Sequence, residues 1–564
     1  MLVSPRSVTK RGRWVGAAML GGAVLLAGCS STGGTPAASG SPSLTGGSGA
    51  AVAGGTAVLG LPSGGIDHLE PTLWYYATSW QVAFATCTPL LSFPDQAGNP
   101  GDQVVGGIAD LPVMSDGGKT YTFTLRSGIT FSNGSPITAE DVRYTWLRML
   151  SPALASPGAG FFSDIIGASD FNAGKSKTVA GITTSGNTIT FKLAKPIGSF
   201  LYRMTLPFAC PVPSGTPMKA IEDGSILGSG PYIVQSYTPD RQLVLAKNTH
   251  YNAAVLGARG KLDTITIQIG VDANSAGLQI RAGQMATYMD RLASADASTA
   301  LQDPTLKGRV FVGTLPSTTY LWLNNSVAPF DNVKVRQAVN YAISRDALLR
   351  VWGGPSQGSV TDQVLPPTMP GWQKAAIYPS SGDATKAIAL LKDSGVTLPI
   401  NTTLRVRSDA PGYLLLAGAV QAQLAAVGIN VKIQSAPDSV NGGVISVPAN
   451  KVPMGINTWT QDYPDPDDFF GTLLDGNRIS TTNNNNYASF NSPSANSQIE
   501  AMDAVTGASR SSQWNTIDQQ IMTQNAPWVP LINPNQVSIV AKGICGYVFH
   551  PVYLLDLTTL GMCG

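Results

Sequence analysis

Residues 121–142, which read YTFTLRSGITFSNGSPITAEDV, decide the fold. Their first residues alternate between apolar and polar side chains, with Tyr121 and Phe123 on one face, which is typical of a half-buried strand. Thr138 and Asp141 then have the spacing of a capping box, and the apolar residues behind them recur at helical intervals. A strand followed by a capped helix predicts a unit of α/β structure.

The rest of the chain repeats this alternation of strands and helices. Residues 262–269 alternate as a strand, and an apolar stripe over 335–343 predicts a helix that Asn332 can cap. Residues 416–427 predict a further helix, which ends at Gly428 and leads into another alternating segment. Units of helix, glycine and strand build lobes in which helices pack on a sheet, so the predicted fold class is α/β in several lobes.

Residues 1–28 have the composition of a secretion signal. Basic residues precede an apolar stretch of about fourteen residues, which is shorter than the roughly twenty residues of a membrane span. The stretch ends in Leu26-Ala27-Gly28-Cys29, which resembles a bacterial lipobox, with Cys29 as the thiol that would carry the lipid. An ordinary signal peptide with a chance cysteine is the alternative.

Residues 29–53 follow this signal and consist almost entirely of Gly, Ser, Thr, Ala and Pro, without a charge. Such a stretch cannot bury enough apolar surface to offset its chain entropy, so we expect a flexible linker. With a lipid on Cys29, the folded part would lie on the outer face of the cell membrane, anchored rather than embedded.

The formal net charge is only +2 and no basic cluster follows residue 13, so a nucleic acid is not an expected partner.

Four cysteines remain besides Cys29. An even number outside the cytoplasm favours disulfides, for which three connectivities are possible. We predict one bond between Cys545 and Cys563, which would hold the C-terminal tail, and one between Cys87 and Cys210; free buried thiols are the alternative. There is no CxxC pattern and the three histidines are far apart, so we expect neither a metal site nor a cofactor.

Five segments resemble the peptide/nickel-type extracellular solute-binding proteins of ABC importers, family 5, and they occur in that family's order. The first is the stretch 121–142. The others are GSGPY at 228–232 with Lys247, Asn248 and Tyr251, then 324–348, 365–371, and WTQDYPDP at 459–466. One such stretch could be chance, whereas five in order are specific.

The resemblance implies a two-lobe clamshell like the periplasmic binding proteins (type II, cluster C-like), with an extra subdomain inserted in lobe I. The implied parts are lobe I at 54–95, 206–312 and 527–564, the inserted subdomain at 96–205, and lobe II at 313–526. It further implies a monomer without catalytic activity, which captures oligo- or dipeptides between the lobes and delivers them to the permease subunits of an ABC importer.

The resemblance also points to Trp459 and Asp462 as ligand-binding residues. In members that bind peptides, the aspartate of the W-x-x-D pattern pairs with the ligand's α-ammonium group, and the tryptophan lines the same pocket. A carboxylate can restore much of the hydration that an ammonium group loses in a closed cleft. The alternative is that Asp462 caps a turn and Trp459 belongs to the core. We include the adjoining Tyr463 in the site and expect Asp465, Asp467 and Asp468 on a solvated turn and helix start.

Two further candidates lie on the predicted strand TYLWLNN, where Tyr320, Trp322 and Asn324 share one face. Strands that cross between the lobes line the cleft in this family, so Trp322 and Asn324 are candidate ligand residues, with core packing as an equal alternative. The aromatic residues at 74–76 follow the first predicted strand and are weaker candidates for the cleft.

Other functions remain open. The same fold could bind another solute, such as a metal chelate, haem or an oligosaccharide, or belong to a surface lipoprotein without a transport role. A hydrolase is the alternative from a different class, because GPSQG at 354–358 matches GxSxG and His550 would then be the base. Its Gly/Pro-rich flanks do not favour the strand and helix that a nucleophile elbow needs.

Overall fold

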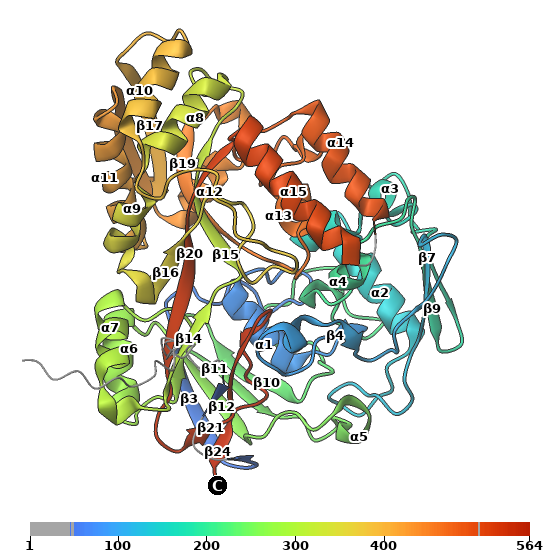
Figure 1. Cartoon of the computed structure of the whole chain (residues 1–564). Coiled ribbons are helices and arrows are strands. Elements are labelled where there is room, and N and C mark those ends of the chain that lie inside the picture. The colour runs from blue at the N-terminus through green and yellow to red at the C-terminus, as the bar shows by residue number, and fades with distance from the viewer. Residues whose placement is uncertain (1–44, 47–49, 506–507) are drawn as a thin grey trace, which may run out of the picture. The chain divides into compact units, whose positions relative to one another are not determined.

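The computed structural model of the protein describes residues 45–46, 50–505 and 508–564 (Figure 1). The expected signal sequence 1–28 and Cys29 lie outside the described residues, as does most of the expected linker. The end of that linker is not free, because β2 (Ala51–Val52) pairs with β24 (Gly561–Cys563) at the C-terminus. None of the described helices is long and apolar enough to span a bilayer.

The first lobe is built on a five-stranded sheet in the order β10-β11-β12-β3-β13. The strands are β3 (Thr56–Leu61), β10 (Tyr232–Thr238), β11 (Gln242–Lys247), β12 (Thr264–Ile269) and β13 (Thr287–Tyr288). β3 is parallel to both of its neighbours, whereas β10, β11 and β12 run antiparallel. The helices of this part are α1 (Ala77–Thr86), α5 (Ala253–Leu256), α6 (Ala273–Arg281) and α7 (Ser294–Gln302).

Residues 121–142 form the strand and the capped helix that the sequence predicts. β7 (Thr120–Thr124) lies in a four-stranded sheet in the order β6-β7-β9-β8, and α2 (Ala139–Leu150) packs against β8 and β9. At the start of α2 the backbone N–H of Asp141 donates to the Thr138 hydroxyl at 3.2 Å, and Asp141 accepts from the backbone N–H of Thr138 at 2.9 Å. The other elements here are β6 (Val113–Ser115), β8 (Ile182–Ser185), β9 (Thr188–Lys192), α3 (Ala168–Asn172) and α4 (Phe200–Arg203).

The second lobe is built on a seven-stranded sheet in the order β14-β20-β15-β19-β17-β18, with β16 paired to β20, and this sheet extends through β14 and the end of β20 into the cores of the first lobe. Its strands are β14 (Val310–Thr314), β15 (Ser317–Leu323), β16 (Gly358–Val360), β17 (Ile400–Arg407), β18 (Ile429–Ala436), β19 (Met454–Thr460) and β20 (Trp528–Ile539). Its helices are α8 (Val333–Ala342), α9 (Arg345–Trp352), α10 (Ala384–Asp393), α11 (Pro411–Ala425), α12 (Asp438–Ile445), α13 (Asp467–Leu473), α14 (Pro493–Ala501) and α15 (Ala508–Gln524). The predicted cap is present, since Asn332 accepts from the N–H of Lys334 at the start of α8.

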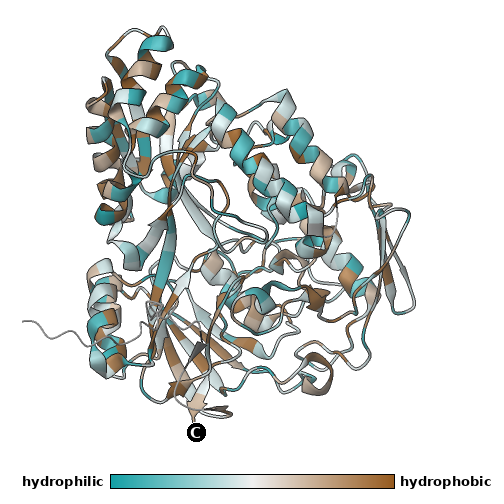
Figure 2. Cartoon of the chain, in the orientation of Figure 1, coloured by the Kyte–Doolittle hydropathy of each residue, from teal (hydrophilic) through white to brown (hydrophobic). Residues whose placement is uncertain are grey.

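Strand β20 links the two lobes. In Figure 1 it runs from the part that carries α8 and α9 to the part that carries β3. Val529 and Leu531, near its start, belong to the core of the second lobe, whereas Val540, just past its end, belongs to the core around β3. In Figure 2 the strands of the first lobe's sheet are strongly hydrophobic, as a sheet that contributes to a core requires.

Strand β15 is buried on both faces. Leu321 and Leu323 face the core beneath α8 and α11, whereas Tyr320 and Trp322 face a second core that includes Phe470 on α13. The predicted alternation is therefore correct. The aromatic face, however, is covered by protein side chains.

Both predicted disulfides are present. Cys87, at the end of α1, is bonded to Cys210, and Cys545 in β21 (Ile544–Cys545) is bonded to Cys563 in β24. The second bond, together with the pairing of β2, fixes the C-terminal tail to the start of the folded part.

The two disulfides should contribute unequally to stability. Their cysteines are 123 and 18 residues apart. In the chain-entropy account, disulfides that close loops of these lengths raise the free energy of the unfolded chain by about 5 and about 3 kcal/mol, respectively. Urea denaturation should therefore show a larger loss for Cys87→Ser with Cys210→Ser than for Cys545→Ser with Cys563→Ser. Equal losses, or the reverse order, would contradict this prediction.

Candidate functional site

The candidate site lies where β19 ends and α13 begins. Trp459 is the penultimate residue of β19, and a tight turn over 461–466 leads into the helix at Asp467. The turn and the first helical residues carry four aspartates, and all are buried: Asp462 is 7% exposed, Asp465 4%, Asp467 1% and Asp468 0%. The expectation that Asp465, Asp467 and Asp468 lie in solvent is therefore wrong. The loss of hydration of four buried carboxylates within seven residues must be offset by ion pairs, hydrogen bonds or protonation.

Two of these aspartates have cationic partners. The guanidinium of Arg510 donates to both oxygens of Asp465, at 2.9 and 2.8 Å. Arg203 donates to Asp467 at 2.6 Å and holds the pKa of this carboxyl well below its usual value despite its burial. Asp465 and Asp467 therefore tie this segment to the rest of the fold, because Arg203 lies on α4 and Arg510 on α15.

Asp462 and Asp468, called the acid pair below, have no such partner. Neither carboxylate forms an ion pair with a Lys, Arg or His among residues 45–46, 50–505 and 508–564. The backbone N–H of Asp462 donates to Oδ2 of Asp468 at 3.0 Å, and Trp459 Nε1 donates to the same oxygen at 3.1 Å. The other oxygen of Asp468, Oδ1, is buried without a hydrogen-bond partner in the described structure.

The first lobe contributes Tyr75 to the site. Its hydroxyl donates to Asp462 Oδ2 at 2.9 Å, a contact between residues 387 positions apart. The tyrosine is held from both sides, because Asp67 accepts from its backbone N–H at 2.6 Å and its ring packs against Trp80 and Phe208. The contact therefore joins a fixed point of lobe I to the acid pair of lobe II.

The acid pair keeps a proton near neutral pH. Burial raises the pKa of Asp462 to about 7, although the hydrogen bond from Tyr75 acts in the opposite direction. Burial and the nearby charge of Asp462 raise the pKa of Asp468 well above its ordinary value. The pKa of the Tyr75 hydroxyl is also raised, by its burial and by the two carboxylates, so it remains a neutral donor.

The structure places the other candidate residues in the fold. Trp322 is 1% exposed, and its Nε1 donates to Asn457 Oδ1 at 3.1 Å. The amide of Asn324 donates to the carbonyl of Val452 at 2.8 Å, and its oxygen accepts from the N–H of Ser326. Their polar groups thus have partners within lobe II, and a contact of either side chain with a ligand stays a prediction.

Tyr463 also has a structural role. It is 1% exposed, and its hydroxyl donates to Asp467 Oδ2 at 3.1 Å, where it supports the ion pair with Arg203. Of the five predicted ligand residues, the structure thus brings only Trp459 and Asp462 together. Trp459 is half-buried and contacts the pair through its indole N–H.

The residues of the hydrolase alternative do not form a catalytic arrangement. Ser356 lies in a 3-10 turn that is followed by strand β16, not by a helix. His550 is fully buried; its Nδ1 accepts from two backbone N–H groups, Nε2 donates to the carbonyl of Pro94 at 2.8 Å, and burial lowers its pKa to about 4. No group of three or more His, Cys, Asp or Glu in the described part of the chain could hold a metal ion.

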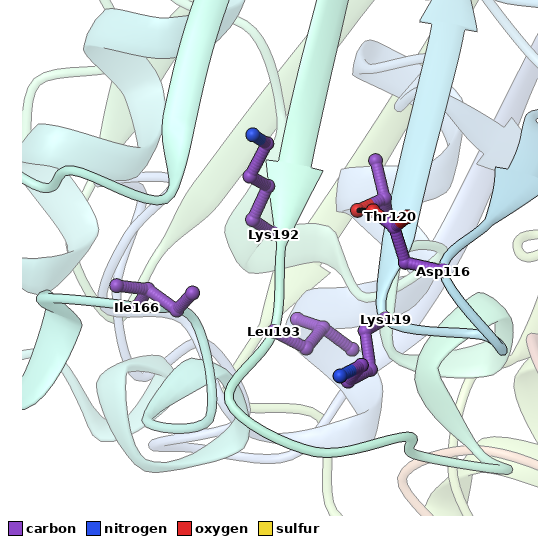
Figure 3. Close-up of a pocket in the computed structure, with 6 residues that line it drawn as sticks. All are labelled: Asp116, Lys119, Thr120, Ile166, Lys192 and Leu193. Carbon is purple, nitrogen blue, oxygen red and sulfur yellow. Dashed lines mark hydrogen bonds between the residues drawn. The ribbon is translucent and has the colours of Figure 1, made fainter.

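Two surface hollows lie away from the acid pair. Figure 3 shows one of about 440 Å³ at the ends of β7 and β9, lined by Asp116, Lys119, Thr120, Ile166, Lys192 and Leu193. A second, of about 640 Å³, is lined by residues 219–223 together with Tyr237 and Pro239. Neither includes a residue of the 459–468 segment, and the polar groups of the first do not converge on a common point. The buried acid pair therefore remains the candidate site.

The acid pair should leave a signature in the pH dependence of stability. A carboxyl whose pKa is raised in the folded state binds its proton more tightly there than in the unfolded chain, so the stability it contributes at low pH is lost as pH rises from about 4 through 7. Asp462→Asn removes this loss and should gain stability relative to the parent over that range, as measured by chemical denaturation. Asp465→Asn, the matched control, breaks the pair with Arg510 and should lose about 3–5 kcal/mol. A difference between Asp462→Asn and the parent that is constant from pH 4 to 8 would contradict the raised pKa.

Known proteins resemble this chain over most of its length. The relatives include the "Probable D,D-dipeptide-binding periplasmic protein DdpA" of Escherichia coli K12, which is 25% identical over 499 residues, covering 86% of this chain and 90% of the relative. They also include heme-binding protein A of Haemophilus influenzae, which is 26% identical over 477 residues and covers 79% of this chain and 81% of the relative.

A solved structure shares the fold. The clavulanic acid biosynthesis oligopeptide binding protein 2 superimposes with a TM-score of 0.84 at 25% identity, over 93% of this chain and 99% of that protein. The two-lobe α/β clamshell implied by the sequence is thus confirmed. Residues 103–481 match the family described as bacterial extracellular solute-binding proteins, family 5 Middle. Because this match covers more than half of the chain, the protein belongs to the bacterial extracellular solute-binding proteins of family 5.

Proposed function

We propose that the protein captures peptides, or similar small solutes with a protonated amino group, between its two lobes, and that Asp462 binds this group. The captured solute would pass to the permease subunits of an ABC importer, and the protein itself would catalyse no reaction. Membership of the family supports capture of a solute. The peptide-binding names of two of the similar proteins support the choice of ligand.

One observation carries the proposal. Asp462 is a buried carboxylate without a cationic partner, while the two aspartates beside it in the same turn have arginines. An ammonium group that enters such a site loses its hydration, and a charge-assisted hydrogen bond to the carboxylate compensates for much of the cost. The segment therefore provides attraction for one positive charge that the protein does not supply.

The position of Asp462 suits capture between lobes. Its partner Tyr75 comes from lobe I, whereas Asp462 and Trp459 belong to lobe II. A solute bound at this carboxylate would contact both lobes. It would therefore favour the closed arrangement, in which it contacts both lobes at once, over an open one in which it contacts a single lobe. The tyrosine hydroxyl is a neutral donor that a stronger, charged donor can supplement or displace.

Haem is the second candidate, because one relative is named for binding it. Its propionate groups are anionic, and the buried acid pair would repel them. His550 is committed to backbone groups, and His68 hydrogen-bonds to Glu222 at 2.7 Å, so neither is a ready iron ligand. The charge of the site therefore favours a cationic ligand over haem, and an uncharged oligosaccharide would leave the carboxylate without a cation.

Calorimetry with a free-amine peptide tests the role of Asp462. Asp462→Asn should weaken binding by about 1.5–3 kcal/mol, because it removes a hydrogen bond between charged groups. The same peptide with an acetylated amino terminus should bind parent and variant alike. Asp518→Asn is a suitable control, since Asp518 is a fully buried aspartate with a raised pKa of about 7 that accepts from backbone N–H groups outside the 459–468 segment. Equal affinity of the parent and Asp462→Asn for the free-amine peptide would remove Asp462 from the site.

We also propose that Cys29 carries a lipid that anchors the protein to the outer face of the cell membrane. The basic and apolar composition of 1–28 and the small residues before Cys29 support this. In the native host, Cys29→Ser should release the protein from the membrane fraction into the soluble extracytoplasmic fraction. Intact-mass measurement of the parent should show the added diacylglycerol. An unmodified mature chain that begins at a different residue would contradict the anchor.

A further inference from the structure

We propose that Asp462 and Asp468 act as one unit that exchanges a proton for the ligand's ammonium group, so that capture of the ligand is coupled to pH. In this unit Asp462 contacts the ligand, and Asp468 is a positioning residue that acts through Asp462. The inference rests on the proposed function, because it concerns the same carboxylate. It adds a second residue and a means of regulation to that site.

The geometry of Asp468 is the first support. The residue is completely buried, in the first turn of α13, and its Oδ2 accepts both the backbone N–H of Asp462 and the indole N–H of Trp459. Its Oδ1 is buried and has no partner in the described structure. An ionised carboxylate with an orphan oxygen is costly away from water, whereas a protonated one can use that oxygen to carry and donate a proton.

The surrounding charges are the second support. Three described arginines around this segment form ion pairs with other aspartates: Arg203 with Asp467 at 2.6 Å, Arg510 with Asp465 at 2.8 Å, and Arg478 with Asp475 at 3.1 Å and Asp467 at 3.8 Å. The other titratable groups that act on the pair are the hydroxyls of Tyr75, from the segment before α1, and Tyr463, from the same turn, together with the carboxylate of Asp467. Tyr487, from the loop before α14, neighbours Tyr75. None of these phenols supplies a positive charge. Two carboxylates in contact without a cation cannot both ionise in a dry site, so the pair retains a proton when it is empty.

The exchange itself balances in charge. In the empty pair a carboxyl O–H holds the proton, and the burial that raises the pKa of Asp462 to about 7 keeps it there below neutral pH. When the ligand's ammonium group arrives, the proton leaves to solvent and the carboxylate that remains accepts an N–H from the ammonium. The buried site gains one positive charge and loses one, so no net charge is transferred into the dry interior. The second proton stays shared by the pair.

The affinity for a free-amine ligand should consequently depend on pH. Below pH 7 the ligand must displace a proton, so affinity should increase about tenfold for each pH unit until the pair has lost its first proton. Above that point affinity should level off and then decrease, because the ligand's own amino group loses its proton with a pKa of about 8. A ligand with an acetylated amino terminus displaces no proton and should bind independently of pH in this range.

Loss of Tyr75 or of Asp468 should shift this profile in the same direction. Tyr75 donates to Asp462 and thus favours its ionised form, so Tyr75→Phe should move the midpoint of the profile to higher pH. The hydrogen bond from Asp468 likewise lowers the pKa of Asp462. Asp468→Asn keeps an oxygen for the indole N–H and for the N–H of Asp462, but its amide is a weaker donor to the ionised Asp462 than the carboxyl O–H that it replaces. This variant should therefore also move the midpoint to higher pH. A merely structural role for either side chain would weaken binding equally at every pH.

Calorimetric titration in two buffers of different ionisation enthalpy measures the exchange. The probes are trialanine and its N-acetylated form, titrated into the full mature chain at pH 6 and pH 8. We expect nearly one proton to be released for each trialanine bound by the parent at pH 6, and none with the acetylated form. At pH 8 the parent should show net proton uptake, because about half of the peptide's amino groups are unprotonated there and must gain a proton to bind as ammonium. In Asp468→Asn and Tyr75→Phe this uptake should be smaller or replaced by release, because the pair keeps its first proton to higher pH.

The outcomes separate this inference from the function on which it rests. If the parent binds no free-amine peptide, both the proposed function and the exchange are wrong. If the parent binds trialanine without proton release at pH 6, only the exchange is wrong. If release occurs at pH 6 but the uptake at pH 8 is the same in Asp468→Asn as in the parent, Asp462 titrates alone and the role of Asp468 is wrong. Should Asp468→Asn fail to fold, the upward shift in Tyr75→Phe still decides whether the proton lies on Asp462.

Discussion

A buried carboxylate requires a positive charge or a proton, and this constraint organises the site. Within seven residues the chain buries four aspartates, and it satisfies Asp465 and Asp467 with arginines from α15 and α4. These ion pairs fix the turn in place. Within residues 45–46, 50–505 and 508–564, Asp462 and Asp468 receive neutral donors from Tyr75, Trp459 and the backbone and form no ion pair. The same segment therefore combines a charge-compensated frame with two carboxyls that must keep a proton instead.

The fold positions this segment from both lobes. β19, which carries Trp459, is held in register by β15, and β15 is buried on both faces between two cores. β20 continues from the second lobe into the first, so the lobes share a strand as well as the contact between Tyr75 and Asp462. Tyr75 is itself anchored by Asp67 and by aromatic packing. Each half of the site is thus fixed by contacts within its own part of the fold.

Local patterns predicted much of this architecture, whereas the partners of the site depended on distant contacts. The capping box at Thr138, the two faces of β15 and the two disulfides could be inferred from spacing and cysteine number. Alternation alone could not show that Trp322 faces a second core rather than a cleft, because both environments select an aromatic residue. Asp468 was expected in solvent, since acidic residues at a helix start usually serve the helix. The role of Tyr75 had no signal near Asp462, from which it is separated by 387 residues.

The identity of the neutral donor explains why the site remains available. A lysine or arginine in the place of Tyr75 would form a permanent ion pair with Asp462, and a ligand's ammonium group would then have to displace a full charge. A phenol hydroxyl gives the carboxylate one hydrogen bond and leaves its charge uncompensated. Because the pKa of Tyr75 is raised, the phenol cannot ionise and add to the repulsion within the acid pair. Tyr75 thus gives Asp462 a hydrogen bond without adding a charge, so the protonation of the acid pair is set by the two carboxyls and their burial.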